Sequence, residues 1–511
     1  MASHTLTPFP DDLLAAKKQI RERARSYGLD FFPVVFEMCD YEQMNQIAAY
    51  GGFPQRYPHW RYGSEYESLR KRHHYGLGRI YEMVINNDPC YAYLQESNAL
   101  VDQKLVIAHV YGHSDFFKNN LWFSQTNRKM MDEMANHATH VRKHIEKHGY
   151  DVVEKWLDIC LSIEHLIDPH SMFLKRGPND DVVEPAKREE PMVNKFKSKD
   201  YLDRWINPPK VLEAEAKKFR EEKAKMRHAT PSRPTRDVLL YLLEHARLED
   251  WQMDCLSIVR EESYYFAPQA MTKVMNEGWA SYWHSTLMTK HFVEAHDIVD
   301  YADHHSGTVH MPPGNFNPYK IGIELFRDIE DRWNKGKFGK EYEEAQNLGE
   351  KRRWDKGLGL GRDKIFEVRR VYNDVNFIDE FMTPEFIEKH KFYQYGRDPH
   401  TGQLRIVSRD PQRIKQTLLY QLTNMGQPFI FVVDGNYANR GELYLAHKHN
   451  GLDIEIKYAV ETLKNLYRIW QRPVHLQARI DDDMILFTFA GDQPKQQTIH
   501  ADLPKPAHQM A

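Results

Sequence analysis

The sequence predicts a mainly α-helical protein with a small C-terminal α/β domain, and three observations carry this prediction. Apolar residues recur at helical spacing over long stretches between residues 94 and 390. After residue 395 the pattern changes to short β-type runs around one amphipathic helix. The chain has 511 residues, which is too many for one ordinary hydrophobic core, so two or three domains are expected.

The first third of the chain begins with a predicted helix at residues 11–27, which has an acidic start and ends before Gly28. Residues 31–93 are aromatic and rich in turn residues, and their run YGGFPQRYPHWRYGSEYE is typical of an ordered loop. Apolar periodicity then predicts three helices, at about residues 94–112, 127–148 and 151–167.

Residues 175–235 differ in character, because they are charged, punctuated by proline and almost free of large apolar side chains. This composition predicts a solvated linker with one exposed helix. Helical spacing returns at 236–335, and after the polar insert NKGKFGKEYEEAQNLGEKRRWDKGLGLGRDK another helical stretch follows to about residue 390. The strand-like runs QLRIVS, PFIFVVDG, GELYLAHKH and VHLQARIDDDMILFTFAG come next. IKYAVETLKNLYRIW is a predicted helix among those strands.

The domain prediction follows from these changes of pattern. Two helical regions are expected to pack together as one core, and the linker, the α/β domain and a flexible tail are separate segments. The predicted ranges are 1–174 for the helical region with the HVYGH motif, 175–235 for the linker, 236–393 for the helical region with the NEGWASYWH motif, 394–495 for the α/β domain and 496–511 for the tail.

Composition excludes several classes of protein. The net charge is −3 and the isoelectric point about 6.8, so the whole chain gives no case for binding nucleic acid or an anionic membrane. The four cysteines are far apart in sequence, which argues against a cysteine-type zinc site or a disulfide framework. The N-terminus lacks an apolar signal region and the run FIFVV is too short to span a bilayer, so a cytoplasmic protein without an integral membrane segment is expected.

The HVYGH motif places His109 and His113 four residues apart. On a helix this spacing puts both imidazoles on one face, close enough to share a metal ion. Asp102 lies on the same stripe and is a candidate for supporting hydrogen bonds. Zincin peptidases use this histidine spacing in the motif HExxH, but position 110, where their water-activating glutamate stands, is Val110 here. Ordinary core or surface histidines are the alternative interpretation.

The NEGWASYWH motif places Glu277 and His284 seven residues apart, about two helical turns, so they share a helix face. Thermolysin-like zincins take their third ligand from a glutamate on a later helix, which makes Glu277 a candidate metal ligand. His284 is a candidate fourth ligand or proton-transfer group. In the alternative interpretation this segment is a buried structural helix, with its Trp and Tyr side chains in the core. That alternative leaves a glutamate and a histidine on one stripe unexplained, because charged groups are rarely buried unpaired.

Two histidines and one carboxylate suit Zn²⁺ with an open coordination position, and they also suit Fe²⁺ in a facial triad. The predicted cofactor is therefore a divalent metal, with Zn²⁺ as the first choice and Fe²⁺ as the alternative. Supporting hydrogen bonds are expected from the run HDIVDYADHHSGTVH, whose candidates are Asp303, His304 and His305. A solvated helix end is the alternative for that run.

Glu261 and Glu262, upstream of the NEGWASYWH motif, are candidates for the missing catalytic base. A surface charge cluster is the alternative for this pair. We expect the His109/His113 and Glu277/His284 stripes to face each other across two helices, so that their ligand atoms converge on one point.

Several long runs resemble the SpoVR family, named after stage V sporulation protein R. They are AHVYGHSDFFKNN, PQAMTKVMNEGWASYWH, PPGNFNPYKIGIELF, VYNDVNFIDEFMTPEF and DPCYAYL. The similarity extends over residues 10–490. It implies a link to spore cortex, peptidoglycan or stress physiology, and as partners a PrkA-type serine kinase and a von Willebrand-factor-like protein. NEGWASY is also similar to the EGWALY helix of some zincin-type peptidases, whose glutamate binds the metal.

Two functional hypotheses remain open from the sequence. The first is a metal-dependent hydrolase that acts on an amide bond, for instance in peptidoglycan precursors, through His109, His113 and Glu277. The second is a scaffold or regulator of the kinase system, built on a degenerate zincin-like helical core. The two aligned stripes favour the hydrolase, and the missing glutamate at position 110 favours the scaffold.

Overall fold

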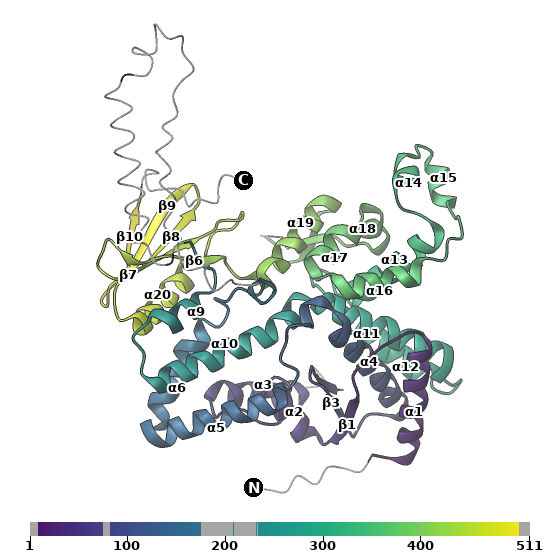
Figure 1. Cartoon of the computed structure of the whole chain (residues 1–511). Coiled ribbons are helices and arrows are strands. Elements are labelled where there is room, and N and C mark those ends of the chain that lie inside the picture. The colour runs from purple at the N-terminus through teal and green to yellow at the C-terminus, as the bar shows by residue number, and fades with distance from the viewer. Residues whose placement is uncertain are drawn as a thin grey trace. The chain divides into compact units, whose positions relative to one another are not determined.

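The computed structural model describes residues 9–74, 82–174, 208, 231, 233–398 and 400–499 (Figure 1). Most of the predicted linker and the last part of the predicted tail lie outside the described residues. The chain divides into two compact units, one of Met1–Val153 with Tyr264–Gly426 and the other of Glu154–Ser263 with Gln427–Ala511. The domain ranges proposed from the sequence stay a prediction.

The mainly α-helical class is confirmed, and so is a small C-terminal sheet. The α-helices of the first unit are α1 Asp11–Ser26, α2 Tyr41–Ala49, α3 Trp60–His74, α4 Leu100–Asn119, α5 Met130–His148, α11 Lys273–Leu287, α12 Ile298–Thr308, α13 Pro318–Lys335, α14 Lys340–Glu344, α15 Leu348–Arg353, α16 Gly361–Val371, α17 Asp374–Phe381, α18 Pro384–His390 and α19 Pro411–Leu422. Short helical turns are η1 Leu121–Phe123, the π-helical η3 Met288–Phe292 and η4 Thr423–Gly426.

The second unit contains η2 Ser171–Phe173, α9 Val238–His245 and α20 Ile456–Trp470, and the helices α6 Tyr150–Ser162 and α10 Asp250–Met271 include the unit boundaries. None of the helices among the described residues is long and apolar enough to cross a membrane.

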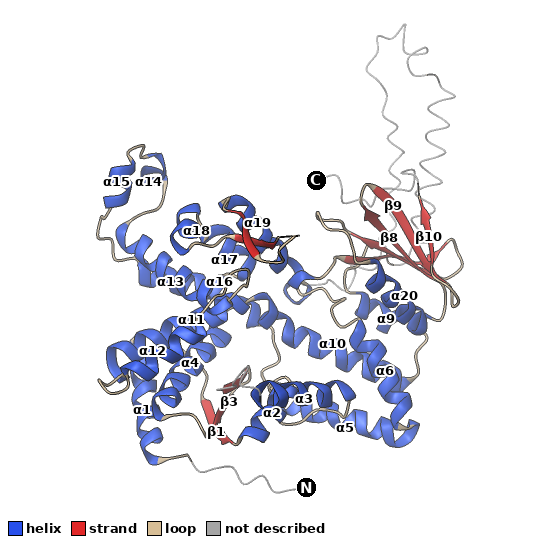
Figure 2. Cartoon of the chain, turned by 180° about the vertical axis from the view of Figure 1, so that it is seen from behind, coloured by secondary structure: helices blue, strands red, loops and turns tan. Residues whose placement is uncertain are grey.

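A three-stranded sheet in the first unit was not predicted from the sequence (Figure 2). It consists of β1 Val34–Cys39, β2 Glu82–Ile85 and β3 Cys90–Gln95 in the order β1-β3-β2, with β1 parallel and β2 antiparallel to β3. The predicted helix start at residue 94 was therefore wrong, because the chain is a strand up to Gln95 and α4 begins at Leu100. A short apolar run such as CYAYLQ fits a buried strand or a buried helix equally well, and only its sheet partners decide.

Three glycines set the helix packing of the first unit. A Cβ atom added to Gly112 of α4 would lie 2.7 Å from the Ala280 Cα of α11. One added to Gly278 of α11 would lie 2.4 Å from the Gly322 Cα of α13. Real Cβ atoms do not come so close to a backbone, so only glycine allows these helices to approach to this distance. The contact of α4 with α11 at Gly112 lies between the two histidines of the HVYGH motif.

The sheet of the second unit has the order β10-β9-β8-β7-β6, with β6 Ile430–Tyr437, β7 Glu442–His447, β8 Val474–Ile480, β9 Asp483–Phe489 and β10 Lys495–Thr498. Only β7 and β8 are parallel neighbours, and α20 is the crossover between them. Helix α20 buries Leu463, Leu466 and Ile469, as its amphipathic sequence predicts. The hairpin β4 Gln394–Arg397 with β5 Leu404–Ser408 belongs to the first unit.

Candidate metal centre

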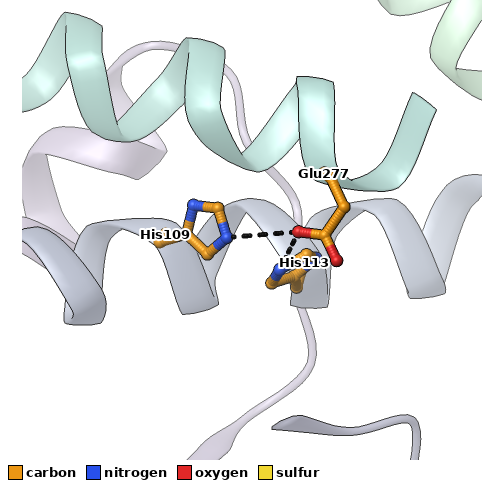
Figure 3. A group of neighbouring side chains, drawn as sticks. All are labelled: His109, His113 and Glu277. Atoms are coloured by element: carbon orange, nitrogen blue, oxygen red, sulfur yellow. Dashed lines mark ion pairs between the residues drawn. The ribbon is translucent and has the colours of Figure 1, made fainter. Parts of the chain in front are cut away.

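Helix α4 places two imidazoles on the face that meets α11. His109 and His113 are both almost fully buried, and their ring centroids are 4.5 Å apart with the planes nearly perpendicular. Glu277 of α11 extends its carboxylate between them (Figure 3). Its Oε2 atom lies 3.6 Å from the Nε2 atom of His109 and 3.5 Å from the Nε2 atom of His113. The two predicted stripes thus lie face to face.

The spacing of these three atoms suits a metal ion. All three ligand atoms lie within 4.8 Å of one another. Metal bonds of about 2.0–2.2 Å in a tetrahedral arrangement separate ligand atoms by roughly 3.3–3.6 Å. The Oε2 atom of Glu277 is buried and has no hydrogen-bond partner among the described residues. A buried carboxylate oxygen without a partner is costly, and a cation between the three atoms removes that cost.

The opposite ring nitrogens of the two histidines have partners of their own. The Nδ1 atom of His113 lies 2.9 Å from the Oδ1 atom of Asn276, and an amide oxygen can only accept, so His113 donates from Nδ1. The Nδ1 atom of His109 lies 2.9 Å from the Nδ1 atom of His284. Such contacts fix the orientation of both rings and leave each Nε2 atom facing Glu277, as in metal-binding histidines with supporting hydrogen bonds.

The protonation tendencies of the site agree with this arrangement. Burial lowers the pKa of His113 to about 4, with a further contribution from His109, so His113 is neutral at pH 7 and its Nε2 atom can act as a ligand. Burial also lowers the pKa of His284 well below its ordinary value. Burial alone would raise the pKa of Glu277, but His109 and His113 outweigh it, so the pKa is lowered and the carboxylate is anionic.

The other predicted site residues take different positions. His284 contacts His109 on the ring nitrogen that faces away from Glu277, and its Nε2 atom lies 3.2 Å from the Nδ1 atom of His305 on α12. The Nδ1 atom of His304 on the same helix donates to the Oδ1 atom of Asp102 on α4 over 2.7 Å. Asp303 is exposed on α12. The structure thus brings Asp102, His304 and His305 into hydrogen-bonded contact between α4, α11 and α12.

Glu261 and Glu262 lie on α10 in the second compact unit, the first exposed and the second buried. Their role as a catalytic base stays a prediction.

Two residues beside the site were missed from the sequence. The Glu82 Oε1 atom of β2 lies 4.0 Å from the Nε2 atom of His109. Burial raises the pKa of Glu82, and the imidazole of His109 opposes that shift only in part. Tyr319 of α13 stacks on His109 with 6.2 Å between ring centroids, and its hydroxyl lies against the Glu277 carboxylate. Tyr319 lies in the run PPGNFNPYKIGIELF, which carries part of the family resemblance and could have identified it as a site residue. Nothing in the local sequence distinguishes Glu82.

Comparison with known proteins covers nearly the whole chain. A family model described as "SpoVR like protein" matches residues 9–427, and one described as "SpoVR-like C-terminal domain" matches residues 428–481. The chain is 30% identical over 498 residues to a protein of Escherichia coli (strain K12) named "Uncharacterized protein YcgB", covering 91% of this chain and 92% of that protein. No solved structure matches the chain.

Proposed function

This chain belongs to the SpoVR family, and from that premise we propose that its first compact unit binds a catalytic divalent metal ion. His109, His113 and Glu277 are the proposed ligands. One observation carries the proposal: the buried Oε2 atom of Glu277 lies at 3.5–3.6 Å from two Nε2 atoms and has no hydrogen-bond partner among the described residues. A carboxylate that served only the fold would be expected to have donors on that oxygen.

The donor set favours zinc. Two imidazole nitrogens and one carboxylate oxygen are the ligands of many hydrolytic Zn²⁺ sites, which keep one position open. The same set also suits Fe²⁺ in oxygenases. The spacing of the three ligand atoms agrees with a tetrahedral arrangement, which Zn²⁺ prefers. Zn²⁺ is therefore the proposed metal, with Fe²⁺ as the alternative.

The proposed reaction is hydrolysis of an amide bond. A divalent cation at this point polarises an oxygen atom of water or of a carbonyl group. The hydroxyl of Tyr319, beside the Glu277 carboxylate, is the proposed donor to the carbonyl oxygen on which charge develops during attack. Peptidoglycan precursors are the amide substrates that the family's link to the spore cortex suggests.

A second candidate function is a scaffold or regulator, and Val110 favours it. The position that carries the water-activating glutamate in zincins holds a fully buried apolar side chain. Under this proposal the helical unit keeps a zincin-like arrangement without catalysis. Its partners would be the PrkA-type serine kinase and the von Willebrand-factor-like protein that the family resemblance suggests.

Metal analysis of protein purified without a histidine tag tests the first proposal. We expect about one divalent metal ion per chain, and we expect Glu277→Gln to lose it, because the amide keeps the side-chain shape but removes the negative charge. Glu42→Gln, which changes an exposed glutamate on α2, is the matched control and should keep the metal.

Thermal melting of the metal-free proteins separates the two functions. If Glu277 is a ligand, metal-free Glu277→Gln melts close to metal-free wild type. If Glu277 is instead a structural carboxylate paired with a protonated histidine, the substitution breaks a buried pair and costs roughly 3–5 kcal/mol. If neither protein contains metal and Glu277→Gln shows that loss of stability, the hydrolase proposal is rejected in favour of the scaffold.

A further inference from the structure

Helix α4 has no free carboxylate for amide hydrolysis, because its two aspartates, Asp102 and Asp115, are already hydrogen-bonded to other side chains. Val110 is fully buried and belongs to the hydrophobic core of the first unit. The neighbouring Tyr111 is also buried in that core. A group that holds the attacking water must therefore come from another element.

Strand β2 brings one carboxylate to the site. Glu82 is the first residue of β2, the edge strand of the order β1-β3-β2, and its pairing with Leu94 of β3 fixes its backbone. Its Oε1 atom lies 4.0 Å from the Nε2 atom of His109. The side chain is 20% exposed, nearly the same as the 19% of Glu277, so neither carboxylate is fully enclosed by protein.

Glu82 is better placed to form a hydrogen bond with a metal-bound water molecule than to bind the metal ion itself. Its carboxylate is not among the three groups whose ligand atoms all lie within 4.8 Å of one another. A water molecule about 2.0–2.2 Å from the ion and about 2.7–2.8 Å from a carboxylate places that carboxylate beyond the ligands, beside one of them. Glu82 stands in that relation to His109. No hydrogen bond to another described side chain holds its carboxylate, so the group is available for a bound molecule.

We propose that Glu82 is the catalytic residue that orients the attacking water, in place of the glutamate that HExxH motifs carry on the helix. This inference rests on the proposed hydrolytic metal centre. The water oxygen forms a bond to the carbonyl carbon of an amide while its proton passes to Glu82. The carbon–nitrogen bond then breaks, and that proton goes to the leaving amine. One water is consumed, and the products are a carboxylic acid and an amine.

Acetohydroxamic acid is a suitable probe, because it chelates divalent metals and offers polar hydrogens to a neighbouring carboxylate. The full-length protein is loaded with Co²⁺, and its visible spectrum is titrated with the probe. We expect Glu82→Gln to keep one Co²⁺ ion per chain and to bind the probe roughly 10–100-fold more weakly, because a hydrogen bond to a charged acceptor is lost.

Two further variants accompany this experiment. Glu82→Asp keeps the charge but shortens the side chain by one methylene group. We therefore expect it to bind the probe more weakly while it still binds Co²⁺. Glu37→Gln changes a half-buried glutamate on β1 of the same sheet and is the matched control, for which probe binding should equal wild type.

The other outcomes overturn the inference in distinguishable ways. If Glu82→Gln binds the probe as tightly as wild type, Glu82 has no catalytic role, and the proposed metal centre is unaffected. Loss of Co²⁺ from Glu82→Gln would make Glu82 a ligand instead of a water partner. Failure of both Glu82 variants to fold would give the residue a structural role. A wild-type protein that binds no metal would end both the proposed function and this inference.

Discussion

Each compact unit places buried imidazoles against carboxylates, but the two groups differ in how their polar atoms are satisfied. In the second unit, the Nε2 atom of His475 lies 2.8 Å from Glu442, and its Nδ1 atom lies 2.9 Å from Thr488. Arg440 donates two hydrogen bonds to the same Glu442. In the first unit, the Oε2 atom of Glu277 approaches the Nε2 atoms of His109 and His113 only to 3.5–3.6 Å. Within the described part of the chain, that oxygen has no hydrogen-bond partner.

The difference separates a structural polar cluster from a binding site. Glu442, His475 and Thr488 lie on the strands β7, β8 and β9 and form a diagonal row. His475 pairs with Thr488 and with Tyr444, and Glu442 lies two residues before Tyr444 on the same face. Every hydrogen-bonding atom of that imidazole is used, so the row stabilises the sheet without a ligand. The ligand atoms of the first unit converge at a distance that suits a cation and does not suit direct hydrogen bonds.

Disturbing the helix contacts of the first unit should have the largest effect. A Cβ atom on Gly322 would lie 2.2 Å from the carbonyl oxygen of Val274 and 2.6 Å from the Gly278 Cα. Gly322→Ala must therefore separate α11 from α13, and we expect the free energy of unfolding to fall by at least about 3 kcal/mol. Chemical denaturation measures this change.

The matched control for the glycine contact is Gly63→Ala on α3. No atom of the described residues lies within 4 Å of a Cβ atom at that position, so alanine should leave stability unchanged or raise it by about 0.5–1 kcal/mol through its better helix propensity. A Gly322→Ala protein as stable as the Gly63→Ala protein would contradict the proposed role of close helix contacts in forming the site.

Metal removal should affect only one of the two polar groups. At a free metal concentration 100-fold above Kd, binding stabilises the folded state by about 2.7 kcal/mol, and a chelator abolishes this contribution. Hydrogen–deuterium exchange should therefore show faster exchange in α4 after chelation and unchanged exchange in β8. His475→Ala should keep the full metal content. Faster exchange in β8 alone would place the metal in the second unit.

A smaller effect is expected from the partner of His113. Asn276→Ala removes the oxygen that accepts the Nδ1 hydrogen of His113, so the ring loses its fixed orientation. Loss of such a supporting hydrogen bond commonly weakens metal binding about 10–100-fold. Competition with a chromogenic chelator measures the affinity. Ser281→Ala on the same helix is the control, because its buried hydroxyl has no hydrogen-bond partner among the described residues, and metal affinity should not change.

Helical periodicity was sufficient to predict the α-helical class and the pairing of the two stripes. His109, His113 and Glu277 lie on helices whose internal phase is readable from the sequence. Glu82 was not predictable, because a strand of four residues at a sheet edge has little periodicity and its neighbour Leu94 was assigned to a helix. His284 was expected beside the ion, and only the tertiary structure shows which ring nitrogen of His109 it contacts.

The polar cluster of the C-terminal domain was not predicted from the sequence. His475 and Glu442 are 33 residues apart in sequence and adjacent in space, so their contact depends on a parallel strand pairing across α20 that the sequence pattern does not specify. Strand runs show which residues share a face, but the order of strands determines which side chains meet.

The smallest expected effect concerns His447 of β7, a buried histidine of the second unit outside the polar row. Burial lowers its pKa to about 4, and His449 contributes. Because this value lies below the roughly 6.5 of an unfolded chain, the neutral ring favours folding. That stabilisation is complete above pH 6.5 and is lost as the pH falls from 6.5 toward 4. The two pKa values correspond to a loss of about 1.8 kcal/mol between pH 7 and pH 5, and solvent screening reduces the expected loss to about 1 kcal/mol.

His447→Gln should remove this pH dependence, because glutamine does not titrate. His245→Gln, at a half-exposed position on α9 of the same unit, is the control and should keep the pH dependence of wild type. Denaturation at both pH values, followed through exchange in β7, measures the difference. Equal losses of stability in wild type and His447→Gln would mean that the ring is already hydrated in the folded state. The Nδ1 atom of His447 is buried and has no hydrogen-bond partner among the described residues. If water satisfies it, an oxygen atom such as Glu277 Oε2 could be satisfied by water too, which would weaken the distinction between the two clusters.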